Sequence, residues 1–207
     1  MKQITVYSID ELEGKARDKA ISDYKSILDA SFWDSGHEIV DSYKACLIAF
    51  NITLRDYSLG AYDRSTFAKL DIDDNVKELR GARALAWLEN NGLNDLRMTR
   101  QEYLKRRKDY FTYGPSYRIG HIKPCPLTGM CYDHDFLDTL IKDVKSGDTL
   151  EGAFNGLLDV CTKLLEYEAD YRSSEEYIMG ELSCNDYEFT ETGLKSWNKN
   201  YNNSTLT

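Results

Sequence analysis

The sequence predicts an α+β fold, because two different hydrophobic periods occur along the chain. Between Asp148 and Tyr171, apolar residues recur at spacings of three and four, which is typical of an amphipathic helix of about six turns. Residues 52–72 instead alternate in character, are rich in Thr, Tyr and Leu, and carry Gly60 near the middle, which favours two strands joined by a turn. We therefore expect a small, mostly antiparallel sheet covered by amphipathic helices, with the helix at about 148–171 as the central packing surface.

Three further segments are predicted to add strands to this sheet. They are residues 4–7, 116–133 and 187–190. In the second of these, the CPLTG stretch is the expected turn of a hairpin, and Met130–His134 is its returning strand. Together with the strands of residues 52–72 they would form one sheet.

Most helix starts are marked by capping-box spacing, in which a short polar residue is followed three positions later by glutamate. The pairs are Ser8/Glu11, Ser35/Glu38, Thr99/Glu102, Asp148/Glu151 and Ser173/Glu176. A further helix rests on apolar spacing, with Asn91-Gly92 as its stop. The predicted helices cover residues 8–30, 35–50, 73–91, 99–111, 148–171 and 173–182.

Length and composition indicate one soluble domain. With 207 residues, 42% of them hydrophobic, the chain can bury roughly 70% of its unfolded surface without metal or disulfide support. We expect one α+β domain over residues 1–194 and a polar, frayed tail over residues 195–207. A net charge of −9 disfavours general attraction to nucleic acid or anionic lipid. The absence of a long apolar run predicts no membrane association, and five scattered cysteines fit a reducing cytoplasm.

The predicted hairpin within residues 114–135 is the best candidate for chemistry. It carries His121, Cys125, Cys131 and His134, and imidazoles with thiolates are a good tetrahedral zinc set. The spacing contains neither Cys-x2-Cys nor His-x3-His, which argues against a common zinc finger. A cysteine nucleophile with a histidine base is the other chemical reading, but no catalytic motif accompanies it. We therefore expect no cofactor and no catalytic site, with a metal- or thiol-dependent enzyme as the third alternative for function.

The predicted helix near residues 97–108 contains the one basic cluster of the chain. Its possible nucleic-acid contacts are Arg100, Lys105, Arg106, Arg107 and Lys108. Interleaved aromatic residues such as Tyr103 and Tyr110 would suit contacts to phosphates and bases. A solvated helix face explains the same pattern, and no known nucleic-acid-binding signature accompanies it.

An acidic stretch between Glu166 and Glu191 contains nine acidic residues and one basic residue, Arg172, so its net charge is −8. Nearly all of the net charge of the chain therefore lies in this stretch. Tyrosines are interleaved with the carboxylates, which suits a binding face, although a solvated acidic surface is the alternative. The predicted partner-binding residues are Glu168, Glu175, Glu176, Tyr177 and Glu181.

Motifs near the two ends of the chain carry a family resemblance. The first is Tyr7-Ser8-x-Asp10-Glu11-Leu12 with Lys15-Ala16 and Lys19-Ala20, followed by Trp33-Asp34-Ser35; the last is Asn185-x-Tyr187-Glu188-Phe189-Thr190-x-x-Gly193. In these motifs the chain resembles an uncharacterised family of small bacteriophage and prophage proteins, some of which are labelled antitoxin-like. Residues 52–135 resemble the family only in their strand and hairpin character.

The resemblance implies a phage accessory protein that acts in the host cytoplasm, and such proteins often inhibit host defence or host metabolism. It carries over no catalytic residue. We therefore expect a non-enzymatic protein that binds and inhibits a host protein with a basic surface, such as a component of an antiviral defence system. The alternative is a nucleic-acid-associated, antitoxin-like regulator that uses the basic helix. The oligomeric state and the target stay open.

Overall fold

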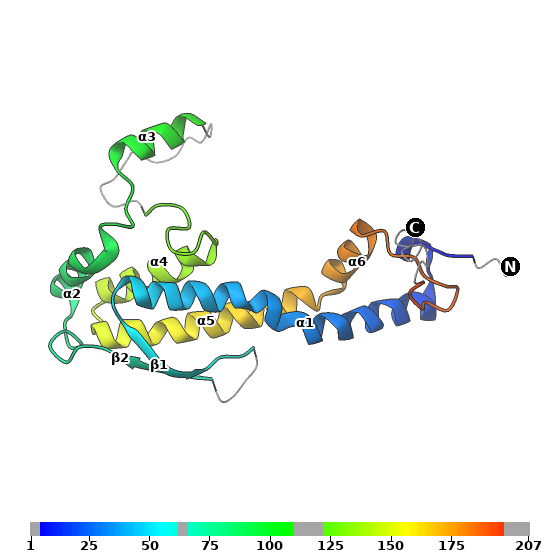
Figure 1. Ribbon diagram of the computed structural model, residues 1–207, viewed down its shortest axis with the longest axis horizontal. Helices are drawn as coiled ribbons and strands as arrows, with labels where there is room; N and C mark the ends of the chain where they lie inside the picture. Colours follow the sequence, from blue (N-terminus) through cyan, green and yellow to red (C-terminus); the bar gives the residue numbers. More distant parts are fainter. Residues whose placement is uncertain (1–4, 62–65, 110–121, 197–207) are drawn as a thin grey trace, which may run out of the picture. The chain divides into compact units, whose positions relative to one another are not determined.

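The computed structural model describes residues 5–61, 66–109 and 122–196, without the side chains of residues 29–36 and 106–109 (Figure 1). The elements are η1 (Ile9–Glu11), α1 (Gly14–Ala49), β1 (Thr53–Ser58), β2 (Phe67–Asp71), α2 (Gly81–Leu88), η2 (Glu89–Leu93), α3 (Arg100–Asp109), α4 (Tyr132–Ser146), α5 (Leu150–Arg172) and α6 (Glu175–Cys184). Here η1 is a 3-10 turn and η2 a π-helical segment. Helices together with a small antiparallel sheet confirm the predicted α+β class.

The sheet of the described residues consists of β1 and β2. The two strands are antiparallel, with Thr53 opposite Asp71, and an irregularity at Arg55 shifts the register. This arrangement confirms the two strands predicted within residues 52–72. The turn between them includes residues 62–65, which lie outside the described part of the chain.

The described residues of the other predicted strands do not join this sheet. Tyr7 and Phe189 meet in a single antiparallel bridge, and Phe189 also bridges to Lys195. The strand predicted over Met130–His134 is wrong, because α4 begins there. Residues 4 and 116–121 of the predicted strands lie outside the described residues.

α4 occupies residues for which no helix was predicted. Its buried residues recur at helical spacing, which is the signal of an amphipathic helix. They include Phe136, Leu137, Leu140 and Val144. Gly147, with a φ of 107°, ends the helix in the left-handed conformation.

α1 is one helix where two were predicted. The Ser8/Glu11 capping box is present, with the Ser8 N–H donating to the Glu11 carboxylate at 2.8 Å, but it opens η1 and not α1. The predicted break before Ser35 does not occur, because the segment lacks proline. A glycine such as Gly36 costs about 1 kcal/mol in a helix interior, and extending an existing helix is easier than nucleating a new one.

α5 confirms the predicted central helix at 148–171, and α6 confirms the short helix that follows it. In both helices the N-cap lies one residue later than expected. The side chains of Thr149 and Ser174 accept the first-turn N–H groups, in place of Asp148 and Ser173. In each helix the N-cap is therefore the residue that follows the predicted one.

The helix predicted over residues 73–91 is shorter in the structure. Residues 73–79 form turns, in which the Asp73 side chain accepts the N–H of Asn75 at 2.9 Å, and only then does α2 begin. At its end, η2 contains Gly92 with a φ of 146°. A Cβ at Gly92 would lie 2.4 Å from the carbonyl oxygen of Ala49, so close packing excludes other residues here.

The chain divides into two compact units. We call residues 36–166 the middle unit, and residues 1–35 with 167–207 the terminal unit. The expectation of one domain over residues 1–194 stays a prediction, because α1 and α5 each contribute residues to both units. Among the described helices, none combines the length and apolarity that a membrane crossing requires.

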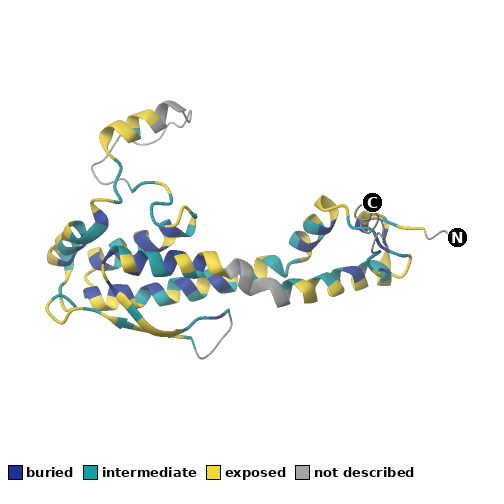
Figure 2. Cartoon of the chain, in the orientation of Figure 1, coloured by how far each residue is buried: buried dark blue, intermediate teal, exposed yellow. Residues whose placement is uncertain are grey.

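The core of the middle unit is formed by side chains from α1, α2, α4 and α5 (Figure 2). The inward stripe of α5 is fully buried at Leu150, Phe154, Leu157, Cys161 and Leu165. Its ring contacts include Phe154 with Phe50, the residue that follows α1, at 5.7 Å between centroids, and with Trp87 of α2, at 6.4 Å. The predicted role of α5 as a packing surface is therefore confirmed, although Leu164 is only half-buried.

Candidate binding surface of the terminal unit

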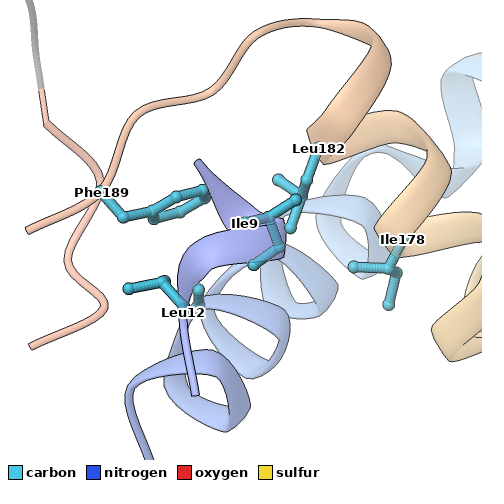
Figure 3. Packing of buried hydrophobic residues seen from close by; sticks show 6 residues of the cluster. Ile9, Leu12, Ile178, Leu182 and Phe189 are labelled. Carbon is cyan, nitrogen blue, oxygen red and sulfur yellow. The ribbon is translucent and has the colours of Figure 1, made fainter. Parts of the chain in front are cut away.

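The core of the terminal unit joins the two motifs that carry the family resemblance. Its buried apolar residues come from η1, α1, α6 and the segment after α6 (Figure 3). They are Ile9, Leu12, Ala20, Ile178, Leu182 and Phe189. Tyr7 and Phe189 exchange both backbone hydrogen bonds, at 2.9 and 2.8 Å. Residues near opposite ends of the sequence thus form one structural unit.

Gly193 closes the C-terminal motif onto α1. Its φ is +77°, and a Cβ at this position would lie 2.0 Å from the carbonyl oxygen of Ala16. A side chain is therefore excluded both by the left-handed backbone and by contact with a rigid helix backbone. The packing of Ala16 of the first motif requires glycine in the last motif.

An open groove of about 600 Å³ lies between residues 6–11 and residues 182–188. Ile9 and Leu182, both buried, belong to its lining and to the hydrophobic core. Tyr7 and Tyr187 contribute aromatic surface. The groove therefore lies directly over the hydrophobic core, its accessible walls are mostly polar and aromatic, and all of its lining residues lie in the terminal unit.

Carboxylates line both sides of this groove. Asp10 and Glu11 come from η1, and Asp186 and Glu188 follow α6. The Ser183 hydroxyl donates to Asp10 at 3.4 Å, which links the two sides. No lysine or arginine is among the described residues that line the groove. The groove is therefore a site of negative potential that favours a cation.

Tyr187 of the groove already contacts a cation of the same chain. The Lys195 ammonium lies 3.6 Å from the centroid of the Tyr187 ring. An edge-on ring contact with Tyr24, at 5.7 Å between centroids, also fixes Tyr187 in orientation. Burial, with the nearby Tyr187 and Glu181, raises the pKa of Tyr24 to about 12, so Tyr24 is neutral at physiological pH.

A second feature is an exposed set of tyrosines from α5 and α6, which we call the tyrosine platform. Tyr167 and Tyr171 stack with ring centroids 6.5 Å apart, and Tyr171 packs edge-on against Tyr177 at 5.1 Å. Tyr167 is 69% exposed and Tyr171 49% exposed. Arg172 lies 5.8 Å from the Tyr177 ring and pairs with Glu168 at 2.6 Å. Large, rigid aromatic area is thus presented beside carboxylates.

The structure places all five predicted partner-binding residues in the terminal unit. Glu175 and Glu176 are exposed in the first turn of α6, where the helix dipole favours negative charge. Glu175 also pairs with Arg17 at 3.3 Å, and Glu181 accepts a hydrogen bond from Asn185 at 3.3 Å. Glu175 and Glu181 therefore have partners within the unit, which the sequence pattern did not indicate. Their role toward a partner stays a prediction.

The four residues of the predicted zinc set are not shown together. His121 lies outside the described residues, and Cys131 is exposed at the start of α4. The Cys125 N–H donates to His134 Nε2 at 3.4 Å. Within the described residues, no three His, Cys, Asp or Glu side chains are grouped to hold a metal ion.

Asp133 organises the loop that precedes α4. Its buried carboxylate accepts the N–H groups of Leu127 and Thr128, at 2.8 and 2.9 Å, and the Thr128 hydroxyl at 2.8 Å. Thr128 in turn lies 3.0 Å from the Ser42 hydroxyl of α1. Burial alone would raise the pKa of Asp133, but these hydrogen bonds outweigh it and lower the pKa. This is the arrangement of a structural carboxylate.

α3 carries the predicted basic cluster. Its capping box is confirmed, since the Thr99 N–H donates to Glu102 at 2.7 Å and the Glu102 N–H donates to the Thr99 hydroxyl at 3.2 Å. Arg100 and Lys105 are exposed, and Leu104 is 43% exposed. The side chains of Arg106, Arg107 and Lys108 lie outside the described residues. The described part of α3 therefore has no buried face.

No protein-family model, curated protein or solved structure matches the chain. The phage-family resemblance thus stays a prediction. Its Trp33-Asp34-Ser35 element lies within α1, with side chains outside the described part. The groove was missed in the sequence because its two sides are far apart along the chain. The one available signal was the pairing of tyrosine with carboxylates in both end motifs.

Proposed function

We propose that this chain is a non-enzymatic binding protein that uses its terminal unit to engage a basic protein surface. The observation that carries the proposal is the exposed tyrosine platform surrounded by carboxylates of α5 and α6. Tyrosines provide contact area at low entropic cost, and they are enriched at the energetic centres of interfaces. The surrounding negative charge steers a basic partner and repels nucleic acid.

Within this class, we propose a phage-encoded accessory protein that binds and inhibits a host protein in the host cytoplasm. The end motifs and their resemblance to phage and prophage proteins support this origin. The favoured class of target is a defence component that holds nucleic acid on a basic surface of its own. The acidic surface of this chain would compete with the nucleic acid for that basic surface. The target would then be inhibited because its nucleic-acid-binding surface is occupied.

The test begins with affinity capture of a partner from host lysate, followed by stopped-flow measurement with the purified partner. The variant is Glu175→Gln/Glu176→Gln/Glu181→Gln. We expect the association rate to fall about tenfold at low salt and to differ little at about 1 M salt, where the Debye length is about 3 Å. The change should appear mainly in association, because the substitutions remove charge and little contact area.

The matched control is Glu38→Gln/Glu78→Gln/Glu151→Gln, which removes the same charge from exposed positions of the middle unit. Circular dichroism should show intact folding for both variants. Equal slowing by both variants would mean that only net charge matters. Unchanged association of the terminal-unit variant at both salt levels would remove the acidic surface from the proposal.

A second candidate function is nucleic-acid association through α3. It is favoured by one observation, the exposure of Arg100 and Lys105 on a capped helix with no buried face. Arg100→Gln/Lys105→Gln should then weaken binding of a labelled duplex. The slope of log affinity against log salt concentration should fall by the amount expected for the loss of about two phosphate contacts. Absence of salt-dependent binding by the unmodified chain would exclude this function.

A further inference from the structure

We propose that the groove between residues 6–11 and 182–188 binds the cationic side chain of an arginine or lysine presented by the partner. The inference rests on the proposed function, because it names the chemistry that the terminal unit would recognise. It concerns a different part of the surface from the tyrosine platform, since no residue of the platform lines the groove. The groove would add specificity to a contact that the acidic surface steers.

The packed core beneath the groove holds the groove in shape. Ile9 and Leu182 are 0% and 1% exposed, and both belong to the packed core, so the base of the groove is preformed. A preformed pocket loses little conformational entropy when it is filled. Ile9 and Leu182 are covered, so the aliphatic part of a lysine or arginine would lie on the accessible surface of Val6 and Tyr7 while its charged end reaches the carboxylates.

The charges of the groove select the sign of the ligand. Asp10 and Glu11 on one side and Asp186 and Glu188 on the other give the groove four carboxylates, and the Lys195 ammonium beside Tyr187 offsets only part of this charge. Phosphate and carboxylate ligands are therefore repelled. An uncharged apolar ligand would leave these carboxylates partly desolvated, which is costly. Because a guanidinium presents several donors in a plane, arginine should bind more tightly than lysine.

An independent observation shows that the aromatic surface here accepts an ammonium group. Lys195 holds its ammonium 3.6 Å from the centroid of the Tyr187 ring, although Lys195 is not among the residues that line the groove. Cation–π contacts with tyrosine are strengthened where neighbouring carboxylates raise the negative potential. The second groove tyrosine, Tyr7, is fixed by its backbone pair with Phe189 and offers a similar ring to an external cation.

Asp186 is the residue through which the groove can be tested most cleanly. It follows the C-cap of α6 with a φ of +51°, a conformation that asparagine adopts at least as readily as aspartate. Asp186→Asn therefore removes the charge and keeps the backbone. Asp10→Asn removes charge from the opposite side without any demand on the left-handed conformation, and so serves as a second variant.

The experiment follows backbone amide chemical shifts of the full chain during titration with N-acetyl-arginine amide. Matched titrations use the lysine compound and the neutral citrulline compound, which has nearly the same shape as arginine. We expect saturable shifts at residues 8–11 and 186–188, with citrulline binding at least about tenfold more weakly. Asp186→Asn and Asp10→Asn should each raise the Kd about fivefold, and added salt should weaken binding. Asp159→Asn, on an exposed position of α5 in the middle unit, should leave the Kd unchanged.

Equal binding of arginine and citrulline, or shifts confined to the tyrosine platform, would overturn the inference. So would unchanged affinity in both groove variants. The outcome is separable from that of the proposed function. If the Glu175/Glu176/Glu181 variant slows partner association but arginine does not bind the groove, the inference fails alone. If arginine binds the groove and partner association does not depend on the acidic residues, the proposed function fails alone.

Discussion

Gly193→Ala should destabilise the terminal unit strongly, because this glycine lets the C-terminal motif reach α1. The left-handed backbone, with a φ of +77°, costs a residue with a Cβ about 1–2 kcal/mol. The new Cβ would lie 2.0 Å from the carbonyl oxygen of Ala16, so the segment must retreat by roughly 1 Å to reach the closest contact that real Cβ atoms show. That retreat loosens Phe189, whose burial contributes about 1.5–3 kcal/mol. The expected loss is about 3–5 kcal/mol.

Alanine substitutions at two other glycines separate the cost of backbone strain from the cost of the close contact with Ala16. Gly180 lies in α6 with open space around its Cβ position, so Gly180→Ala should stabilise by about 0.5–1 kcal/mol. Gly147 has a φ of +107° and open space, so Gly147→Ala should cost about 1–2 kcal/mol from backbone strain alone. From the most to the least stable, the order should be Gly180→Ala, the unmodified chain, Gly147→Ala and Gly193→Ala.

Urea unfolding gives the free energies, and amide hydrogen exchange followed by mass spectrometry locates the loss. For Gly193→Ala, protection should fall in peptides that cover residues 5–13 and 186–196, while the core of the middle unit keeps its protection. If Gly193→Ala costs no more than Gly147→Ala, then the two end motifs do not pack in the way described here.

Two further predictions concern the middle unit. Leu157→Ala should lower the free energy of unfolding in urea by about 2–5 kcal/mol, because Leu157 is fully buried. Leu164→Ala, at a half-buried position, should lower it clearly less, and Lys163→Ala should change it by no more than about 0.5 kcal/mol. An equal effect of all three substitutions would contradict the burial of the α5 stripe. The lowered pKa of Asp133 means that its contribution to stability is fully present above its unfolded pKa of about 3.9 and is lost as pH falls through the lower folded value. Asp133→Asn should therefore cost about 1–3 kcal/mol at neutral pH and flatten the acid limb of the stability profile, and an unchanged acid limb would refute this assignment.

Local signals in the sequence determined the identity of several elements. The apolar period of α5, the alternation of residues 52–72 and the capping box of Thr99 each depend on residues within a few positions of one another. Such short-range patterns directly restrict backbone conformation, and the structure confirms all three. The acidic stretch after Glu166 was likewise visible in composition alone.

Where two local patterns competed, the sequence alone did not predict which structure forms. The Pro126 and Gly129 turn residues favoured a hairpin. The buried stripe from Phe136 onward instead formed α4, and the Asp133 carboxylate of this helix accepts hydrogen bonds from the loop before it. The capping box at Ser8 opened a 3-10 turn, because the helix proper begins beyond it. In each case packing decided which signal prevailed, since burial of a helical face outweighs turn propensity.

The candidate groove was decided by tertiary structure alone. Asp10 and Asp186 belong to motifs that could be recognised separately, but nothing in either motif states that they face a common groove. That juxtaposition depends on the backbone pair between Tyr7 and Phe189 and on the close approach of Gly193 to α1. Sequence determines which charges and rings the chain possesses, whereas long-range packing determines which of them lie close enough to act on one ligand, because contacts between distant residues leave no local period to be read.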